Sequence, residues 1–425
     1  MKQRIFYGWV VVAGLFGVAL LGPMGRYILT SLFPFILKDP GWSRDTVGLA
    51  FTLHFWVYAG FAFATGKLLD RLGGRWIIAT GGALMLAGLL GLSQVRRIWE
   101  FHLIFGILLA AAVSMTHFVP NTAIVRKWFI RKAGLATGIV TAGTVLGLAM
   151  LPPVVSRMSS AYGWRTACLI CGVAIGGAIL AIALGLVRST PESMGLLPDG
   201  DPSSDGRSRE PAESFSQCSP TPETPEVSSA ELSPAQAYRT RRFWYFFLVY
   251  AITGIPLQGI LSHIIVWAVE AGVSVSHSGW VMAALTLPSL PIRVLAGRLG
   301  DRFGKRRMLL LTNGLTAIMW FIGYVIIQGN VSFFIFVTLL GFVYSAPFSL
   351  YTPYLGDLFG RASVGTLMGA VTLGHGVIGG VGPYLWGWIA DRTGSYGLNC
   401  IVSGICYVLV TWLLWKIREI RPEAS

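Results

Sequence analysis

The chain has 425 residues, of which 54% are hydrophobic and 12% are charged, and its mean hydropathy is +0.65. Soluble domains carry about twice this fraction of charged residues, so the composition excludes a soluble globular protein. The net charge of +14 does not indicate a nucleic-acid-binding protein, because the basic residues fall between apolar segments.

Twelve apolar segments are long enough to cross a bilayer as helices, which takes roughly 20 residues each. The first follows Lys2 and Arg4, but it is too long for a signal peptide and lacks a small-residue cleavage site. The sequence therefore predicts an all-α membrane protein. In chain order we expect spans at 5–36, 45–66, 76–94, 99–125, 133–155, 165–187, 242–268, 278–298, 307–327, 330–356, 362–388 and 396–416.

The distribution of basic residues predicts that both termini lie in the cytoplasm. With that orientation, 24 of the 33 Lys and Arg residues lie on the cytoplasmic side, seven lie outside, and Arg26 and Arg293 lie within spans. An excess of positive charge in cytoplasmic loops is the rule for multi-span proteins. We also expect these loops to contact anionic lipid headgroups.

The segment 191–234 differs from the rest of the chain. It holds 8 of the 21 prolines and 9 of the 19 acidic residues. Such a segment buries too little apolar surface to offset the entropy of ordering it. We therefore expect an N-terminal six-helix bundle at 1–190, a disordered cytoplasmic linker at 191–238 and a C-terminal six-helix bundle at 239–425.

The two halves repeat one motif. Residues 66–76 read GKLLDRLGGRW and residues 297–307 read GRLGDRFGKRR, so six of eleven positions are identical. Each copy follows the second span of its half. A single copy would suit any positively charged turn, whereas duplication at equivalent positions indicates two related halves.

This repeated stretch resembles the signature loop of the major facilitator superfamily, and the resemblance covers essentially the whole chain. It implies a fold of two pseudo-symmetric six-helix halves, with one central site that opens alternately to either side. It also implies that Asp70, Arg71, Asp301 and Arg302 pair across the inner face and stabilise the outward-facing state.

Three further stretches indicate a branch of that superfamily. Residues 128–147, which enter the fifth span, resemble the signature of monocarboxylate and oxalate/formate-type transporters. The shorter stretches 6–9 and 41–44 resemble bacterial members of the same group. Glycine and alanine at 138, 142, 143 and 147 also leave a small face on which another helix packs closely.

Arg293 is the main candidate for substrate binding. A charge within a span costs about 2.5–3.5 kcal/mol on insertion scales and marks a functional site by default. Arg293 lies about 20 Å from the outer end of the eighth span, with no acidic residue nearby. Its side chain either extends to the inner headgroups or pairs bidentately with a carboxylate. The resemblance favours the second interpretation, because the family places its carboxylate-binding arginine on this span.

At two positions the residue differs from the one found in the transporters that this chain resembles. Ser289 stands where animal monocarboxylate transporters have an aspartate that takes part in proton coupling. His375 stands where the oxalate transporters have a lysine. A single fixed cation suits a monocarboxylate better than a dianion, and His375 becomes a candidate proton carrier beside Arg293. The alternative is that His375 is a neutral helix-packing residue.

The other candidates are polar, aromatic or apolar side chains within spans. Arg26 is expected toward the outer side, at a vestibule that attracts anions. Tyr344 is expected to form a wall of the site and donate its hydroxyl, although tyrosines in membrane helices usually pack or anchor. The remaining substrate-binding candidates are the polar His117 and Asn121 and the apolar Leu29, Val145 and Leu146.

The sequence contains no nucleotide-binding loop, metal-ligand cluster or catalytic constellation. We therefore expect no catalytic residue, no cofactor, no metal, and no nucleotide or nucleic-acid partner. The sequence predicts a multi-pass transporter of the cell (inner) membrane that acts as a monomer and moves a short monocarboxylate, such as lactate or pyruvate, together with a proton. An anion exchanger of the oxalate/formate type and a non-transporting membrane sensor or scaffold remain as alternatives.

Overall fold

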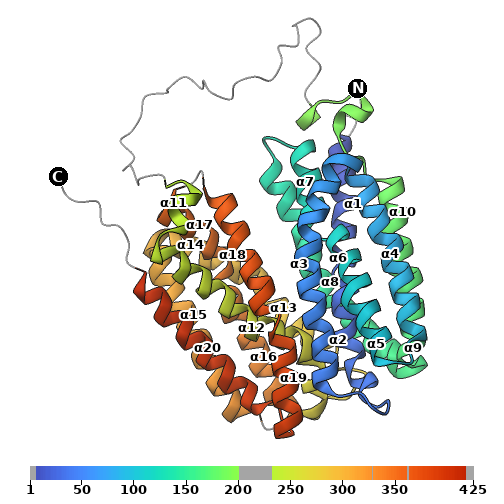
Figure 1. The fold of residues 1–425 in the computed structure, drawn as a ribbon, viewed down its shortest axis with the longest axis vertical. Helices are drawn as coiled ribbons and strands as arrows, with labels where there is room; N and C mark the ends of the chain where they lie inside the picture. Colours follow the sequence, from blue (N-terminus) through green and yellow to red (C-terminus); the bar gives the residue numbers. More distant parts are fainter. Residues whose placement is uncertain (1–5, 201–231, 328, 361–362, 418–425) are drawn as a thin grey trace, which may run out of the picture.

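The structure is a computed structural model that describes residues 6–200, 232–327, 329–360 and 363–417, and these residues form helices and connecting turns without any strand (Figure 1). Among them, eleven helices are long and apolar enough to cross a membrane, and a bent pair raises the number to twelve. The predicted class, an all-α protein with twelve spans, is confirmed.

The N-terminal half contains six spans, two of which include a short π-helical stretch. Its elements are α1 (Tyr7–Leu21), α2 (Met24–Ile36), α3 (Arg44–Leu72), α4 (Gly74–Gln94), α5 (Ile98–Phe101), η1 (His102–Leu109), α6 (Ala110–Thr116), α7 (Phe118–Trp128), α8 (Ala133–Tyr162), α9 (Trp164–Cys171), η2 (Gly172–Gly176) and α10 (Gly177–Gly185).

The C-terminal half follows after two short 3-10 turns, η3 (Pro191–Met194) and η4 (Pro198–Gly200). Its elements are α11 (Pro234–Tyr238), α12 (Arg241–Glu270), α13 (Trp280–Thr286), α14 (Ser289–Phe303), α15 (Lys305–Ile326), α16 (Asn330–Ser345), α17 (Phe348–Phe359), α18 (Val364–Gly379), α19 (Gly382–Thr393) and α20 (Gly397–Lys416).

Several spans are interrupted near their middle, and proline explains most interruptions. The first span breaks before Pro23, the eighth before Pro288 and the tenth before Pro347. Proline lacks the N–H that an α-helix needs and its ring clashes with the preceding turn. In a bilayer such breaks are tolerated only where the freed backbone faces protein or a polar cavity. The breaks therefore point to the interior of the molecule as the place for a polar site.

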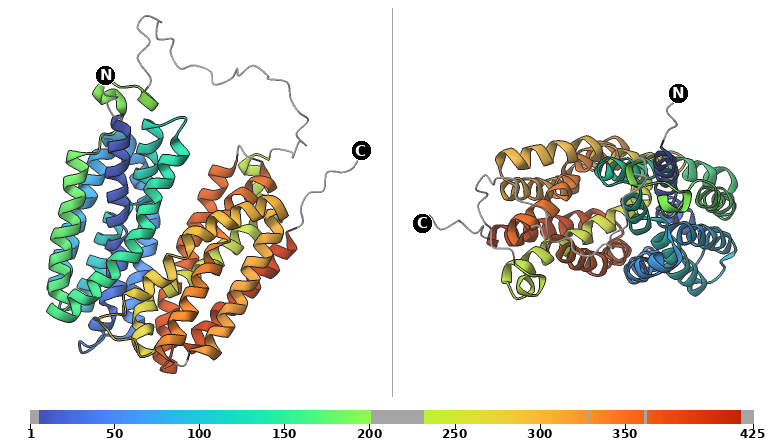
Figure 2. Two further views of the ribbon diagram at one scale, coloured as in Figure 1. Left: turned by 180° about the vertical axis from the view of Figure 1, so that it is seen from behind. Right: turned by 90° about the horizontal axis from the view of Figure 1, so that it is seen from above.

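The two halves meet at one end and diverge at the other. They come together at the end that contains α13 and α19 and separate toward the face that carries both termini (Figures 1 and 2). The helices of the two halves therefore lie farther apart at the face of the termini, which is called the open face below, than at the opposite end.

The predicted linker is shorter than expected at both ends. Residues 191–200 fold into η3 and η4, and the Asp199 carboxylate accepts hydrogen bonds from the backbone N–H groups of Ile130 and Arg131 at 3.1 and 2.9 Å. Residues 234–238 form α11, which is capped by Ser233. These specific contacts order segments whose composition alone predicted disorder. Residues 201–231 lie outside the described residues.

The duplicated motif adopts the same turn in both halves. Gly73, between α3 and α4, has φ 80°, and Gly304, between α14 and α15, has φ 92°. This region of backbone space favours glycine because other side chains are strained there. The repeated glycine is therefore explained by a helix-to-helix turn that both halves share.

Candidate functional site

A cavity of about 190 Å³ lies between the two halves. The N-terminal half contributes residues of α8, and the C-terminal half contributes residues of α12, α13, α14, α16 and α17. The lining is apolar except for a few polar groups. It consists of Val145, Leu148, Leu257, Leu261, Thr286, Ser289, Arg293, Tyr344 and Phe348.

Arg293 supplies the only formal charge among the residues that line this cavity. It lies in a bent span, where the segments Trp280–Arg293 and Leu295–Phe303 meet at 40°. The side chain is exposed, and no carboxylate among the described side chains pairs with it. The hydroxyl-bearing residues Thr286, Ser289 and Tyr344 line the same cavity. The site therefore combines an unpaired guanidinium with neutral hydroxyl groups.

The structure brings some of the predicted substrate-binding residues into this cavity and leaves others out. Tyr344 and Val145 line it together with Arg293. Leu146, the neighbour of Val145, does not, and Leu29 is fully buried in the core of the molecule.

Several lining residues were not predicted, although helical spacing could have identified them. Leu148 is one turn from Val145, and Phe348 is one turn from Tyr344. Residues three or four apart share a helix face. Leu257 and Leu261 of α12 show the same spacing, but nothing in the sequence indicates which face of that apolar helix points toward the cavity.

Arg26 occupies a second, separate place within the N-terminal half. Its guanidinium carbon lies 4.4 Å from the ring centroids of both Phe55 and Tyr58, and the residue is 6% exposed. Its Nε and one Nη atom are buried without a hydrogen-bond partner among the described residues. The two aromatic rings stabilise the cation. The sequence predicts Arg26 at an outer vestibule. In this conformation the residue is instead enclosed by protein.

The two polar candidates of the fourth span lie outside the cavity of Arg293. His117 Nδ1 is 3.2 Å from the Tyr58 hydroxyl, and the Asn121 amide donates to the Thr116 carbonyl at 3.1 Å. The Asn121 Oδ1 atom is buried without a partner among the described residues. His117 thus contacts Tyr58, which packs on Arg26, and neither His117 nor Asn121 lines the cavity of Arg293.

His375 lies where α18 packs against α12. Its Nδ1 is 2.9 Å from the Tyr250 carbonyl oxygen, and its Nε2 is 3.5 Å from the Gln258 amide nitrogen. A carbonyl accepts only from a protonated nitrogen, so this network implies the neutral Nδ1–H tautomer. The ring of His375 lies 4.9 Å from that of Tyr250, and neither residue is among those that line the cavity.

The motif residues are exposed on the open face. Arg71, Asp301 and Arg302 form no ion pair with any described side chain, and Arg302 instead lies 5.4 Å from the Phe303 ring. The side chain of Asp70 lies outside the described residues. Among Arg71, Asp301 and Arg302, whose side chains the structure describes, the expected pairing across this face is thus not formed in this conformation.

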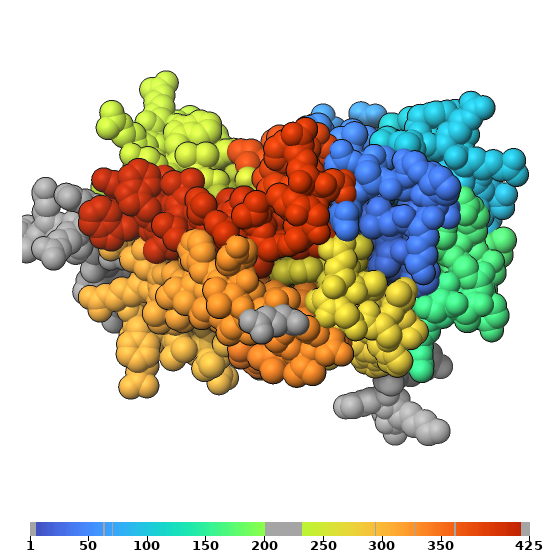
Figure 3. Space-filling view, turned by 90° about the horizontal axis from the view of Figure 1, so that it is seen from below, coloured from blue at the N-terminus to red at the C-terminus, as the bar shows by residue number. Residues whose placement is uncertain are grey.

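The opposite end is closed by contacts between the halves (Figure 3). Arg44 at the start of α3 forms ion pairs with Glu270 of α12 and, at 3.0 Å, with Asp391 of α19. The Asp45 backbone N–H donates to the same Asp391 carboxylate at 2.8 Å. Deeper in the molecule, the Thr30 hydroxyl donates to the Leu261 carbonyl at 3.0 Å.

Glycine allows the closest approach between the halves. A Cβ atom on Gly48 of α3 would lie 2.5 Å from the Pro383 carbonyl oxygen of α19, and one on Gly279 would overlap the Pro152 backbone of α8. Backbone therefore packs directly against backbone at this closed end.

Comparisons with known proteins agree with this architecture. A sequence model described as "Major Facilitator Superfamily" matches residues 15–275 and 247–424. Monocarboxylate transporter 12-B of Danio rerio is 26% identical over 98% of this chain and 88% of its own length. A probable sulfoacetate transporter of Cupriavidus necator is 24% identical over 95% and 92%, respectively.

A solved structure has the same fold. A bacterial homologue of the human lysosomal transporter Spinster, in an inward-facing and occupied conformation, superposes with a TM-score of 0.74 at 15% identity, over 97% of both chains.

Proposed function

Because the chain belongs to the major facilitator superfamily and is therefore a multi-pass membrane transporter and not an enzyme, we propose that it carries a short monocarboxylate of the lactate or pyruvate type together with a proton. The substrate carboxylate pairs with Arg293 in the cavity between the halves. The protein works by alternating access, as a monomer in the cell membrane, with both termini in the cytoplasm.

The observation that carries this proposal is an unpaired guanidinium in a small, largely apolar cavity between the halves. A guanidinium presents two parallel N–H groups to a carboxylate, and the Tyr344 hydroxyl is available as a further donor. The volume of about 190 Å³ is below the roughly 300–1,000 Å³ of drug-sized sites, which suits an anion of a few heavy atoms. The name of the Danio rerio relative supports the same substrate class.

The proton has three candidate carriers. These are the substrate itself, His375 and the hydrogen-bonded surroundings of Arg293. In each case the halves change their orientation when the charge in the cavity is neutralised, because an uncompensated charge in a closed, low-dielectric site is costly.

The test is uptake by reconstituted liposomes. Arg293→Ala is expected to abolish lactate or pyruvate uptake driven by an imposed pH gradient, because the only cation of the cavity is removed. Arg298→Ala, which alters a nearby arginine outside the cavity lining, is the matched control and should retain uptake. Uptake retained by Arg293→Ala, with normal amounts of folded protein, would remove Arg293 from the mechanism.

An anion exchanger is the second candidate. Arg26 is a further cation within a span, buried and without a carboxylate partner among the described residues, and one relative is named a probable sulfoacetate transporter. Two cations would suit a substrate with two negative groups. Counterflow without a pH gradient, abolished when the internal anion is removed, would favour exchange. Both relatives named above are transporters by name, which favours transport over a non-transporting scaffold.

A further inference from the structure

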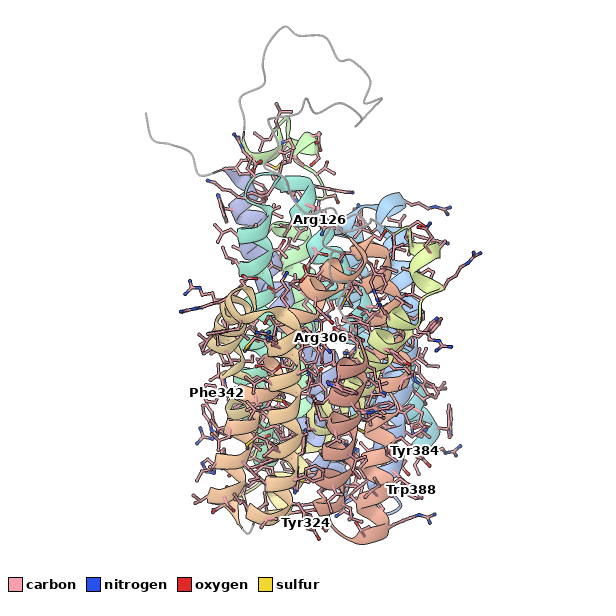
Figure 4. The ribbon with its side chains drawn as sticks, turned by 90° about the vertical axis from the view of Figure 1, so that its left-hand side faces the viewer. Arg126, Arg306, Tyr324, Phe342, Tyr384 and Trp388 are labelled. Atoms are coloured by element: carbon pink, nitrogen blue, oxygen red, sulfur yellow. The ribbon has the colours of Figure 1, made fainter. Side chains whose placement is uncertain are left out.

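A groove of about 600 Å³ lies between α15 and α20, on the outer surface of the C-terminal half and away from the cavity of Arg293. Its lining is apolar apart from one threonine. It consists of Leu310, Gly314, Ala317, Ile318, Phe321, Val408, Thr411, Trp412 and Trp415. This surface is seen in Figure 4, with Arg306 at the end of α15 nearer the termini and Tyr324 toward the opposite end.

Small residues in the middle of the groove leave it open. A Cβ atom on Gly314 would have no neighbour within 4 Å, whereas one on Gly404 would meet the Phe321 ring at 2.7 Å. The two helices are thus in close contact at Gly404 and Phe321, and they leave space between them from there toward the face of the termini. Phe321 closes one end of the groove.

Positively charged residues mark the other end. Arg307 is three residues before Leu310 and seven before Gly314, so it shares their helix face. The Lys416 Nζ lies 5.4 Å from the ring centroids of both Trp412 and Trp415. Arg306 donates to the Trp415 carbonyl at 2.9 Å, but its Nε is buried without a described partner. No described carboxylate pairs with these three cations.

The groove has the length of one leaflet. Its α15 residues run from Leu310 to Phe321, which corresponds to about 16 Å along a helix. The hydrocarbon core of a bilayer is about 30 Å thick, or about 15 Å per leaflet. A single acyl chain therefore matches the groove from its charged end to its closed end.

We propose that this groove binds an anionic phospholipid. One acyl chain lies over Gly314 and Ala317, and the phosphate is held by Arg307 and Lys416, with the charge of Arg306 beside them. Basic pockets between membrane helices on the cytoplasmic side are suited to acidic headgroups. The first turn of α15 has no side-chain cap, so its backbone N–H groups add to the attraction for an anion.

A lipid chain suits the groove better than a partner helix. Trp412 and Trp415 are 51% and 60% exposed and form the rim. A helix of about 10 Å diameter would contact this rim before it reached Gly314, whereas a flexible chain reaches the floor.

Native mass spectrometry of the purified full chain tests the proposal, with added phosphatidylglycerol or phosphatidylcholine. Gly314→Leu fills the groove and is expected to reduce the retained phosphatidylglycerol severalfold. Gly177→Leu, at a position of α10 where a Cβ atom also has no neighbour within 4 Å, is the matched control and should behave as the unaltered protein. Melting temperatures in detergent check that both variants are folded.

The headgroup is tested independently of the groove. The double variant Arg307→Gln, Lys416→Gln is expected to lose about fivefold in phosphatidylglycerol retention for each cation removed, with phosphatidylcholine unaffected. Unchanged phosphatidylglycerol binding by Gly314→Leu would overturn the proposal, and so would equal retention of both lipids by the unaltered protein. A third outcome would also overturn the proposal. If the unaltered protein forms dimers, and Gly314→Leu dissociates them without changing lipid binding, the occupant of the groove is a second copy of the chain.

Discussion

At the scale of single residues, the cavity holds one charge and very few groups able to orient a ligand. The lining residues that can donate a hydrogen bond are Arg293, Tyr344, Thr286 and Ser289. The hydroxyls of Thr286 and Ser289 already donate to the carbonyls of Met282 and Thr286. Arg293 and Tyr344 are therefore the donors left for a substrate.

Replacing Tyr344 by Phe should weaken substrate binding while leaving transport possible. One hydrogen bond contributes about 1 kcal/mol, so we expect the KM for lactate or pyruvate to rise about fivefold with little change in the maximal rate. Tyr354→Phe, on α17 and outside the cavity lining, is the control. An unchanged KM in Tyr344→Phe would show that the hydroxyl does not contact the substrate.

Replacing His375 by Gln should separate the proton carriers. The Gln258 Oε1 atom is buried without a described partner, and a rotated amide would place this oxygen against a protonated Nε2 of His375. If His375 carries the proton, uptake in the variant loses its acceleration at acidic pH. An unchanged pH profile, with initial rates measured from pH 5 to 8, would assign the proton to another group.

The sequence predicts the charged residue of the cavity better than the apolar residues that line it. Arg293 was recognisable because a cation within an apolar span is rare and costly. Leu148, Leu257 and Phe348 were not, because an apolar residue in an apolar helix carries no sign of the face on which it lies. The enclosure of Arg26 by Phe55 and Tyr58 depends on how α2 packs against α3, which spacing along the chain does not reveal.

At the scale of elements, the sequence predicts the membrane spans. It predicts only some of the interruptions within them. Length and hydropathy define the twelve apolar segments, and proline marks the breaks at Pro23, Pro288 and Pro347. Arg26 and Tyr344 lie within one turn of such breaks. Composition failed at the ends of the linker, because the ordering of residues 191–200 depends on contacts with a loop distant in sequence.

Asp199 should control the order of that segment. Hydrogen bonds from the backbone N–H of Arg131, and then of Ile130, lower the pKa of the Asp199 carboxyl below its ordinary value of 3.8. A lowered pKa stabilises the folded contact above pH 3.8, and this stabilisation is lost as the pH falls through the lower, folded-state value.

We therefore expect Asp199→Asn to increase hydrogen exchange of the amides at 191–200 and 130–131 at pH 7. Asp201→Asn, two residues further along, is the control. Equal protection of these amides in Asp199→Asn and in the unaltered protein would show that the carboxylate charge is not what orders the segment.

At the scale of the whole molecule, the described conformation is open toward the termini and closed at the other end. The positive-inside rule predicts that the open face is cytoplasmic. The ion pairs of Arg44 join the halves at the closed end, whereas Arg71, Asp301 and Arg302 of the motif form no ion pair with a described side chain at the open end. The two ends should therefore stabilise opposite orientations.

Replacing Arg44 by Ala should shift the protein away from the conformation that is open toward the termini. The pairs with Glu270 and Asp391 are partly exposed, and such pairs contribute up to about 1 kcal/mol each, so the loss of both should shift the equilibrium by up to about thirtyfold. Distances between spin labels on the closed ends of the two halves measure it. Lys305→Ala breaks an ion pair within one half and should leave these distances unchanged.

The bare backbone contact of Gly48 with Pro383, and that of Gly279 with Pro152, have a mechanical consequence. At these contacts the glycine has no side chain that must change its rotamer when the halves rotate relative to each other. A small rotation about these contacts would move the opposite ends of the halves by a larger distance. A methyl group added to Gly48 or Gly279 would push the two halves apart at this contact. The rotation of the halves, rather than substrate binding, would then limit the rate of transport.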